Sequence, residues 1–520
     1  MLMFNRVSEC YRVEIPLDLP PGAKFIYHAR NSMGFGSVPP LVTAWFGESE
    51  FSSEDVVVVG DDEAHVYLLV GALTAWRSMT FFKVIRRGGR FHSIEVKQPD
   101  IRDGDEPEEI VLLRGDDWRE LLVEYAERVA RATGADRVRK PETTVTGYCS
   151  WYYYFENVTE KDFRENIQAI RANTQSTYQS AVIQIDDGYQ RFHGDWLERR
   201  LDWPSPLPET ARMITEAHRQ AGIWIMPFVA ATTSQVFREH PDWFVREADG
   251  TPGVSRGWSD PPSNLWACLD MTIPEVREHI ASVFKTFVAW GFTYFKMDGL
   301  GFGLMQGRRA DPMATPVSAF QQGMRAIRQA VPQATLLGCS GPFMPCLGHV
   351  DMCRIGADTY ASTRRIEQSF HELGGRWWMF DRYFRADPDV VVVRQDRAEQ
   401  TLGASRISAL AAVMTGTALT SDHLETLSRE RLELLERSAA LHLKDVRPLE
   451  WAKDAWLCRF SGTLDGRRAV ALFNTTDEDQ TCTCSELGFD GPVHERLQPR
   501  GALESSFTLA AHDAMLVCEG

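Results

Sequence analysis

The sequence predicts a (β/α)8 TIM barrel with an N-terminal β-sandwich domain and a small C-terminal antiparallel β-domain. From about residue 145, short apolar runs alternate with amphipathic helical segments, which is typical of a parallel sheet with crossover helices. About eight such runs within roughly 300 residues fit a closed barrel better than an open doubly wound sheet. Both flanks read as short strands separated by turns. We expect the domains to cover residues 1–140, 141–445 and 446–520.

The N-terminal region combines β-runs with one helix. Its clearest runs lie at 56–59, 65–70 and 91–96, between turns rich in Gly, Asp and Glu. An amphipathic helix is predicted over 118–132, and Gly134 can end it. The polar segment 136–144 is expected to be a linker.

The barrel strands are predicted from the apolar runs in chain order, at 147–151, 181–186, 223–229, 292–297, 335–339, 352–355, 390–393 and 418–420. For the seventh strand, residues 377–381 are the alternative. The C-terminal domain is predicted from β-runs without a helix, at 456–460, 469–473, 495–497 and 514–518.

Composition excludes several classes of function. The 520 residues carry a formal net charge of −16, which argues against a nucleic-acid partner, because that affinity comes largely from basic residues that neutralise phosphates. No stretch approaches the roughly 18 to 20 apolar residues of a membrane span, and the N-terminus lacks the pattern of a secretory signal. Ten scattered cysteines are too sparse for a disulfide scaffold and favour the reducing cytoplasm. Without His-x-His or His-Glu-x-x-His, we expect neither a metal nor another cofactor.

Carboxylates follow four of the predicted strands, and the carboxyl ends of barrel strands are where such enzymes place their sites. They are Asp186 with Asp187, Asp298, Asp358 and Asp422. Paired carboxylates without histidine ligands suit glycoside hydrolysis, in which one attacks the anomeric carbon and another protonates the leaving oxygen. The alternatives are a ring of helix caps and ion pairs, with Lys296 and Arg354 as partners, or an inactive sugar-binding barrel.

From Gly147 to Asp422 the motifs resemble those of glycoside hydrolase family 36, the melibiase (α-galactosidase) family, in the clan shared with family 27. The matching segments are GYCSWYYYF at 147–155, IDDGYQ at 185–190, HPDWFV at 240–245, LDMTIPEVREHI at 269–280, FKMDG at 295–299, RIGAD at 354–358, ADPDVVVVR at 386–394 and LTSDHLETL at 419–427. Their order and placement on the strands carry the resemblance.

The resemblance implies a retaining exo-glycosidase that removes terminal α-D-galactosyl residues from oligosaccharides or glycoconjugates. Asp298 would be the nucleophile and Asp358 the general acid/base. The implied substrate-binding residues are Asp186, Asp187, Lys296, Arg354, Trp151, Cys339 and Asp387. Asp186 and Asp187 would hold the axial 4-hydroxyl and the 6-hydroxyl, Trp151 would form a wall of the pocket, and Cys339 would lie near the 2-hydroxyl.

The sequence departs from the family at 339–351, where Pro342 and Phe343 stand in place of glycines. This segment is expected near the C2 substituent, so an α-N-acetylgalactosaminidase is one alternative. Another is an α-galactosyltransferase of the raffinose-synthase type, and a homo-oligomer is also open. Trp196 and Trp203 are candidate walls on the aglycone side, and the Trp377–Trp378 pair suits either the core or a substrate platform.

Overall fold

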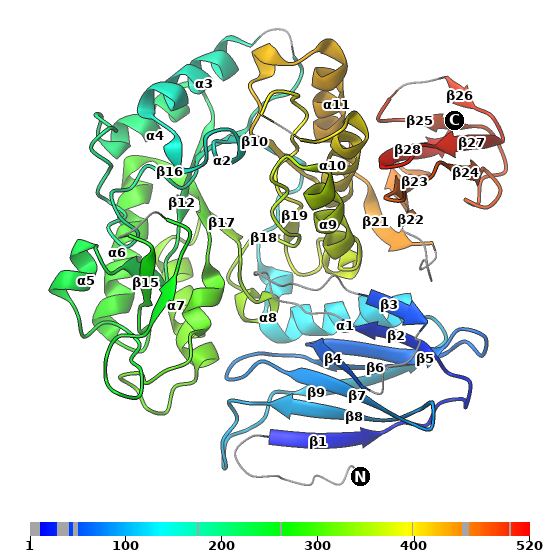
Figure 1. The fold of residues 1–520 in the computed structure, drawn as a ribbon, viewed down its shortest axis with the longest axis horizontal. Coiled ribbons are helices and arrows are strands. Elements are labelled where there is room, and N and C mark those ends of the chain that lie inside the picture. Colours follow the sequence, from blue (N-terminus) through cyan, green and yellow to red (C-terminus); the bar gives the residue numbers. More distant parts are fainter. Residues whose placement is uncertain are drawn as a thin grey trace.

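The computed structural model describes residues 11–28, 41–44, 50–173, 176–259, 263–397, 399–449, 457–498 and 501–520. Its parallel strands form a nearly closed barrel, and antiparallel sheets precede and follow it (Figure 1). This confirms the predicted fold class, whereas the exact domain boundaries stay a prediction. Within the described chain, no helix has the length and apolar character needed to cross a membrane.

Two antiparallel sheets form the N-terminal sandwich. One contains β1 (Tyr11–Pro16), β8 (Arg90–Gln98), β7 (Phe81–Arg87) and β4 (Glu50–Glu54), in that order. The other contains β3 (Leu41–Ala44), β2 (Phe25–His28), β5 (Val56–Asp61), β6 (Val66–Ala72) and β9 (Ile110–Gly115). Side chains such as Val57, Val70, Phe82 and Ile94 fill the space between the sheets, as the alternation along each strand requires.

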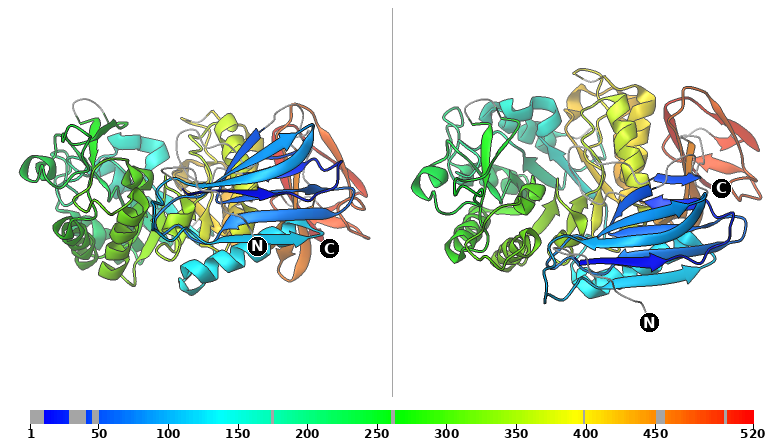
Figure 2. Two further views of the ribbon diagram at one scale, coloured as in Figure 1. Left: turned by 90° about the horizontal axis from the view of Figure 1, so that it is seen from below. Right: turned by 60° about the horizontal axis from the view of Figure 1, so that its bottom comes forward.

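Helix α1 (Trp118–Thr133) joins the sandwich to the barrel. Asp117 caps its start, and Gly134 ends it with a φ of 79°, a left-handed conformation that glycine adopts without steric cost. Tyr125 donates from its hydroxyl to the carbonyls of Asp55 and Ala72 in the sandwich. Both views in Figure 2 show the N-terminal strands along one side of the molecule, close to the C-terminal sheet.

The barrel strands run in the order β19-β18-β17-β16-β12-β11-β10-β20, and neighbours are parallel. They are β10 (Val145–Cys149), β11 (Val182–Ile185), β12 (Gln220–Ile225), β16 (Phe292–Met297), β17 (Thr335–Gly338), β18 (Met352–Arg354), β19 (Arg385–Asp387) and β20 (Thr417–Thr420). The end strands β19 and β20 are linked by two hydrogen bonds, from Thr417 Oγ1 to the Ala386 carbonyl at 2.8 Å and from Arg385 to the Gly416 carbonyl at 3.0 Å. These contacts bring the sheet almost to closure.

The α-helices that follow the barrel strands are α2 (Trp151–Tyr154), α3 (Glu160–Ala172), α4 (Leu207–Glu216), α5 (Gln235–Glu239), α6 (Pro274–Trp290), α7 (Pro316–Ala330), α8 (Phe343–Cys346), α9 (Thr363–Gly374), α10 (Leu402–Thr415) and α11 (Arg429–Ala440). The short 3-10 helices are η1 (Ala135–Arg137), η2 (Phe155–Asn157), η3 (Leu300–Leu304), η4 (Trp377–Met379) and η5 (Leu424–Thr426). A small sheet of β13 (Val229–Ala231), β15 (Leu265–Cys268) and β14 (Val254–Arg256) is inserted after β12.

The prediction of the seventh strand was wrong in both of its forms. The strand is β19, Arg385–Asp387, whereas residues 390–393 are buried without strand pairing and the alternative segment begins with the 3-10 helix η4. Asp389 has a φ of 80°, so the chain turns between β19 and the valine run. The four valines are as buried as the residues of a core strand, which is why this apolar run was misread as a strand.

The C-terminal part contains a six-stranded antiparallel sheet and a two-stranded one. The larger sheet comprises β21 (Lys444–Pro448), β22 (Leu457–Leu464), β23 (Arg467–Asn474), β28 (Asp513–Glu519), β25 (Val493–Glu495) and β26 (Ala502–Leu503). The smaller one comprises β24 (Gln480–Thr483) and β27 (Ser506–Leu509). The predicted strand start at Trp456 lies outside the described residues.

Candidate active site

Asp298 follows β16 directly and lies at the carboxyl end of the barrel. Its Oδ2 accepts a hydrogen bond from the indole Nε1 of Trp224 at 3.1 Å, and its Oδ1 accepts one from the backbone N–H of Gly299 at 2.7 Å. Burial alone would raise the pKa of Asp298. The charge of Lys296 and the hydrogen bonds from Ser340, Gly299 and Trp224 outweigh burial and hold the pKa below its usual value. This carboxylate is therefore ionised over a wide range of pH.

Lys296 lies on the same face of β16 as Asp298, two residues earlier. Its ammonium forms a buried ion pair with Asp186 Oδ2 at 2.9 Å, so its ion-pair partner is the carboxylate at the end of β11. Asp186 also accepts hydrogen bonds from Gln184 Nε2 at 2.5 Å and from the backbone N–H of Asp187 at 3.0 Å. Burial raises the pKa of Asp186, although Lys296 counteracts this. One ammonium thus acts on the carboxylates at the ends of β11 and β16, two strands that are separated by β12 in the sheet.

Asp187 is buried beside Asp186 and is held by donors from its own loop and from the inserted sheet. Its oxygens accept from Gln190 Nε2 at 2.6 Å and from the indole Nε1 of Trp258 at 2.8 Å, and His193 Nε2 lies 3.5 Å away. Burial would raise the pKa of Asp187, but His193 and these hydrogen bonds lower it. Trp258 is 40% exposed, so its indole lies between this buried carboxylate and the solvent.

Cys339 directly follows β17, the strand between β16 and β18. Its side chain is buried, and its Sγ is 3.6 Å from the Ser340 hydroxyl and 3.9 Å from Arg354 Nη1. Burial raises the pKa of this thiol, and the charges of both Asp298 and Asp358 act on it. Because β17 lies between β16 and β18 in the sheet, Cys339 follows the strand between those that lead to Asp298 and Asp358.

Asp358 is the half-exposed carboxylate of the site, with 41% of its side chain accessible. Its Oδ1 accepts from Arg354 Nη2 at 2.9 Å, and Tyr360 forms a further side-chain hydrogen bond to it. Burial alone would lower the pKa of Arg354. Asp389, Cys339 and Asp358 outweigh burial and raise it. Arg354 is accordingly a fully charged, buried partner for an open carboxylate.

The end of β19 contributes Asp387 and Asp389. Burial raises the pKa of Asp387 to about 6; Arg354 opposes this shift and Asp389 adds to it. Oδ1 of Asp387 accepts from the backbone N–H of Asp389 at 3.0 Å. Asp389 in turn binds Arg354 Nη1 at 3.1 Å. Asp387 thus lies among the charged groups that surround Arg354.

The fourth strand-end carboxylate, Asp422, is not part of this cluster. It forms a fully buried ion pair with Arg394 at 2.6 Å and accepts from the backbone N–H groups of Val393 and Arg394. These contacts fix the valine run against β20, so Asp422 has a structural role.

Trp151, at the start of α2, is partly buried beside Phe155, with ring centroids 5.4 Å apart.

Several tryptophans predicted as candidates for sugar contacts are core residues instead. Trp196 and Trp203 have 1% and 0% exposure, so neither forms an aglycone wall. The Trp377–Trp378 pair is also buried, and the indole of Trp378 donates to the Tyr27 hydroxyl at 2.8 Å. This pair therefore joins the barrel to the sandwich, which is the core alternative.

Phe343, one of the residues that depart from the family pattern, is fully buried. It packs against Phe384, with ring centroids 6.0 Å apart, and beneath the guanidinium of Arg376. Its side chain is thus committed to the core beside α8.

Four residues of the site were not found from the sequence: Trp224, Trp258, Ser340 and Asp389. Trp224 lies in β12 within an apolar run, and its orientation toward Asp298 could have been inferred from the alternation of that strand. Ser340 follows Cys339 with a φ of 52°, for which the sequence has no signal. Trp258 comes from the inserted sheet, far from any predicted strand end.

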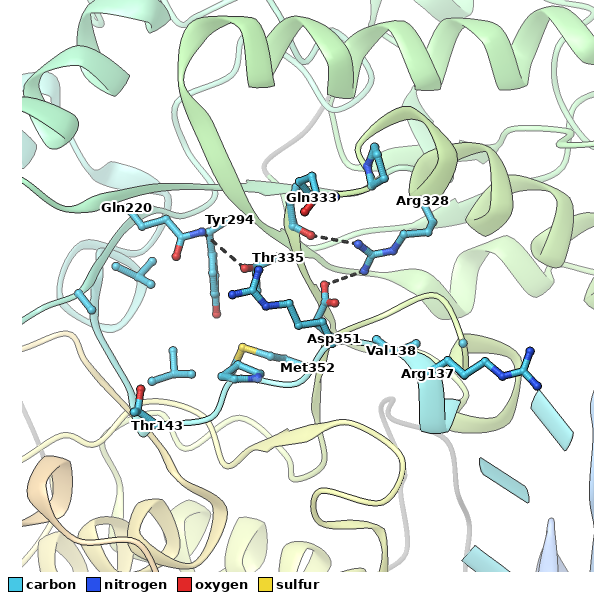
Figure 3. Close-up of a pocket in the computed structure, with 18 of the residues that line it drawn as sticks. Arg137, Val138, Thr143, Gln220, Tyr294, Arg328, Gln333, Thr335, Asp351 and Met352 are labelled. Atoms are coloured by element: carbon cyan, nitrogen blue, oxygen red, sulfur yellow. Dashed lines mark hydrogen bonds and ion pairs between the residues drawn. The ribbon is translucent and has the colours of Figure 1, made fainter. Parts of the chain in front are cut away.

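A cavity of about 770 Å³ lies at the opposite end of the barrel (Figure 3). It is lined by residues at the amino ends of the strands, including Gln220, Thr335 and Met352, and by the 3-10 helix η1. Arg328 and Asp351, which both line the cavity, form an ion pair of 2.6 Å. None of the predicted site residues lines it. Within the described residues, no group of three or more His, Cys, Asp or Glu side chains could hold a metal ion.

One family model matches a part of the chain. Residues 166–300 match the model described as Melibiase. The resemblance to the melibiase family is confirmed. Alpha-galactosidase AgaA of Geobacillus stearothermophilus is 23% identical over 224 residues, which cover 42% of this chain and 29% of AgaA. A type blood alpha-D-galactosamine galactosaminidase of Flavonifractor plautii is 28% identical over 121 residues, which cover 22% of this chain and 11% of that protein.

The fold is shared along most of the chain. TtGalA, an alpha-galactosidase from Thermus thermophilus solved in complex with p-nitrophenyl alpha-D-galactopyranoside, superposes with a TM-score of 0.68 at 22% identity, covering 90% of this chain and 95% of that one. At this identity the likeness establishes the fold. The sequence matches cover 29% of AgaA and 11% of the galactosaminidase, so this chain aligns with less than a third of the length of each of these two relatives.

Proposed function

We propose that the chain is a retaining exo-glycosidase that hydrolyses terminal α-D-galactosyl residues. The observation that carries the proposal is the pairing of a buried Asp298, whose pKa is held low by Lys296 and three hydrogen bonds, with the half-exposed Asp358 across Cys339. A nucleophile must be ionised, and a general acid must reach the leaving group at the open side of the site. The galactosides named for the relatives agree with this chemistry.

The reaction is a double displacement. Asp298 attacks the anomeric carbon while Asp358 donates its proton to the departing oxygen, so that the C–O bond to the aglycone breaks as the glycosyl–Asp298 bond forms. Asp358, now ionised, takes a proton from water, and the resulting hydroxide attacks the anomeric carbon and releases Asp298. Two inversions give net retention of the α configuration, and no cofactor takes part.

Substrate recognition is assigned to the charged groups around the two reacting carboxylates. Asp186, Asp187 and Lys296 would bind the 4- and 6-hydroxyls, and Arg354, Cys339 and Asp387 would face the remaining hydroxyls, with Trp151 at the rim. A charged hydrogen bond contributes about 1.5–3 kcal/mol, and a site built for an axial hydroxyl rejects an equatorial epimer strongly. We accordingly expect galactose to be preferred to glucose.

The test is a panel of aryl α-glycosides carrying galactose, N-acetylgalactosamine or glucose, with the anomer of the first product followed by proton NMR. We expect turnover of the galactoside with release of the α-anomer, and loss of several orders of magnitude in Asp298→Asn. Turnover by Asp298→Asn within tenfold of wild type, or release of the β-anomer, contradicts the assignment.

An α-N-acetylgalactosaminidase is the second candidate, because the relative from Flavonifractor plautii is named for a galactosaminidase and the segment 339–351 departs from the family pattern. Phe343 packs into the core, so its ring is not available to occupy the space beside C2. The same panel separates the two candidates by their ratio of kcat/KM. Product analysis at high sugar concentration separates hydrolysis from transfer to a sugar acceptor.

We also infer that the protein works in a reducing compartment such as the cytoplasm. Cys339, Cys346 and Cys353 are free, buried cysteines, which agrees with a chain that folds without disulfide oxidation. Fractionation of the source cells would test this.

A further inference from the structure

Asp389 makes contacts on both sides of Asp358 without touching it. Its Oδ2 accepts from the backbone N–H of Thr359 at 3.0 Å and from the Thr359 hydroxyl at 3.1 Å. Its Oδ1 lies 3.1 Å from Arg354 Nη1, while Nη2 of the same guanidinium donates to Asp358. Asp389 therefore fixes the residue after Asp358 and the arginine that binds Asp358.

A residue that follows a third barrel strand also binds the carboxylate of Asp389. Tyr152, from α2 after β10, donates from its hydroxyl to Asp389 Oδ2 at 2.6 Å. Asp389 is 5% exposed and has a φ of 80°, a left-handed conformation that costs a non-glycine residue of order 1–3 kcal/mol and persists only where its surroundings hold it. The four donors to its carboxylate supply that hold.

The charges around Asp358 give this arrangement a chemical consequence. Arg354 and Tyr360 face Asp358 from its own loop, Tyr152 from α2 and Cys339 from the end of β17, and the carboxylates of Asp387 and Asp389 approach from beyond Arg354. A guanidinium beside a carboxyl favours its ionised form, whereas a nearby carboxylate disfavours it. Asp389 shares the guanidinium of Arg354 with Asp358 and adds a negative charge beside it.

We propose that Asp389 is a positioning residue for Asp358: it orients the loop through Thr359 and divides the charge of Arg354 between two carboxylates. This inference rests on the proposed function, because it assumes that Asp358 is the acid/base. It differs from a purely structural role in predicting an effect that depends on the leaving group and on pH.

The experiment uses the full-length protein and the substitution Asp389→Asn, which keeps the size and removes the charge. The amide can keep its oxygen toward Thr359 and Tyr152, but its NH2 then faces the guanidinium, so Arg354 is left to Asp358 alone. The measurements are kcat and KM for melibiose, which has a sugar leaving group, and for an activated aryl α-galactoside, from pH 4 to pH 9.

The matched control is Asp351→Asn. Asp351 is also a buried aspartate that binds an arginine, Arg328 at 2.6 Å, and a backbone N–H, that of Leu336 at 2.7 Å. It lies at the opposite end of the barrel, so its loss measures the cost of breaking such a network without touching the site.

For Asp389→Asn we expect kcat on melibiose to fall about tenfold or more, a part of the roughly 10²–10⁴-fold that a positioned general acid contributes. The aryl galactoside should lose less than about threefold, because it needs little protonation. The alkaline limb of kcat for melibiose should move to lower pH, and KM should change little. Asp351→Asn should lower the melting temperature and leave the ratio of the two substrates and the limb unchanged.

Equal losses on both substrates with an unmoved alkaline limb, or no loss at all, overturn the inference. Thr359→Val is the second variant, which removes one hydroxyl donor to Asp389. It should show a smaller effect of the same kind. If Asp389→Asn does not fold, the kinetics of Thr359→Val decide whether the positioning role holds. Asp358→Ala is measured in parallel. If Asp358→Ala itself shows no dependence on the leaving group, the proposed function fails; if only the Asp389 and Thr359 variants lack it, the positioning role fails.

Discussion

Replacing Lys296 by methionine tests how one buried ammonium supports two carboxylates. The change keeps the length of the side chain and removes its charge. In the native protein this ammonium lies 2.9 Å from Asp186 Oδ2 and is the largest of the influences that lower the pKa of Asp298. The substitution therefore acts on stability through Asp186 and on catalysis through Asp298.

The stability cost follows from the burial of the pair. Removing one partner of a buried ion pair typically costs about 3–5 kcal/mol. Asp186 keeps the hydrogen bonds from Gln184 and from the backbone N–H of Asp187, so we expect the lower end, about 3 kcal/mol at pH 8. Burial already raises the pKa of Asp186, and loss of Lys296 raises it further. Because the folded state then binds a proton more tightly than the unfolded chain, the cost shrinks as pH falls through the folded-state pKa.

The catalytic cost follows from the nucleophile. Without Lys296 the pKa of Asp298 rises toward and above its usual value, so the acid limb of kcat/KM should move to higher pH. Loss of a charged hydrogen bond to the sugar adds a decrease of about 10- to 150-fold in kcat/KM, which corresponds to 1.5–3 kcal/mol.

The assay is denaturant unfolding at pH 5 and pH 8 together with kcat/KM for an aryl α-galactoside across that range. Lys140→Met is the control, since Lys140 is a partly buried lysine at the opposite end of the barrel that donates to the Ala135 carbonyl at 3.0 Å. It should leave the acid limb unchanged. An unmoved acid limb in Lys296→Met, or a stability loss independent of pH, refutes the reasoning.

Three further substitutions test other parts of the site. Asp358→Ala should reduce kcat for melibiose far more than for an activated aryl galactoside, and azide should restore turnover of the latter as a glycosyl azide of retained configuration; equal losses without azide rescue would remove Asp358 from the acid/base role. Asp187→Asn should narrow the ratio of kcat/KM for galactoside over glucoside because its carboxylate would bind the sugar hydroxyls, and an unchanged ratio argues against that contact. Asp422→Asn should lower the free energy of unfolding by about 3 kcal/mol, because it leaves Arg394 buried without its charge partner, and a stability within about 0.5 kcal/mol of wild type would contradict the structural role.

The sequence predicted those parts of the fold that leave a local pattern. Seven barrel strands coincide with apolar runs, and α1 ends at Gly134 as its periodicity and that glycine predict. Strand β19 was missed because it has only three residues, and both its ends are polar: Arg385 reaches the seam of the barrel, and Asp387 faces the site. Its place is set by pairing with β18, which no local pattern records.

Residues of the candidate site that directly follow barrel strands could be predicted from the sequence. Residues that reach the site from distant segments could not. Asp186, Lys296, Asp298, Arg354 and Asp358 come together because parallel strands bring their carboxyl ends to one edge. Trp258 reaches Asp187 from an inserted sheet, and Asp389 reaches Arg354 through a turn with positive φ. Such contacts depend on tertiary placement, whereas Asp422 shows the converse, since a carboxylate at a strand end can serve the core alone.

The balance of charge across the site favours the proposed transition state. Among the described residues, the cluster contains the cations Lys296 and Arg354, with His193 beside Asp187, and six carboxyl groups: Asp186, Asp187, Asp298, Asp358, Asp387 and Asp389. Even with Asp358 protonated and with Asp387, whose pKa is about 6, protonated below that pH, the carboxylates outnumber the cations. An excess of fixed negative charge stabilises positive charge that develops on the sugar ring, and such preorganised electrostatic stabilisation is a large contribution to catalysis. The charge distribution of the cluster is therefore matched to the oxocarbenium-like transition state of the proposed reaction.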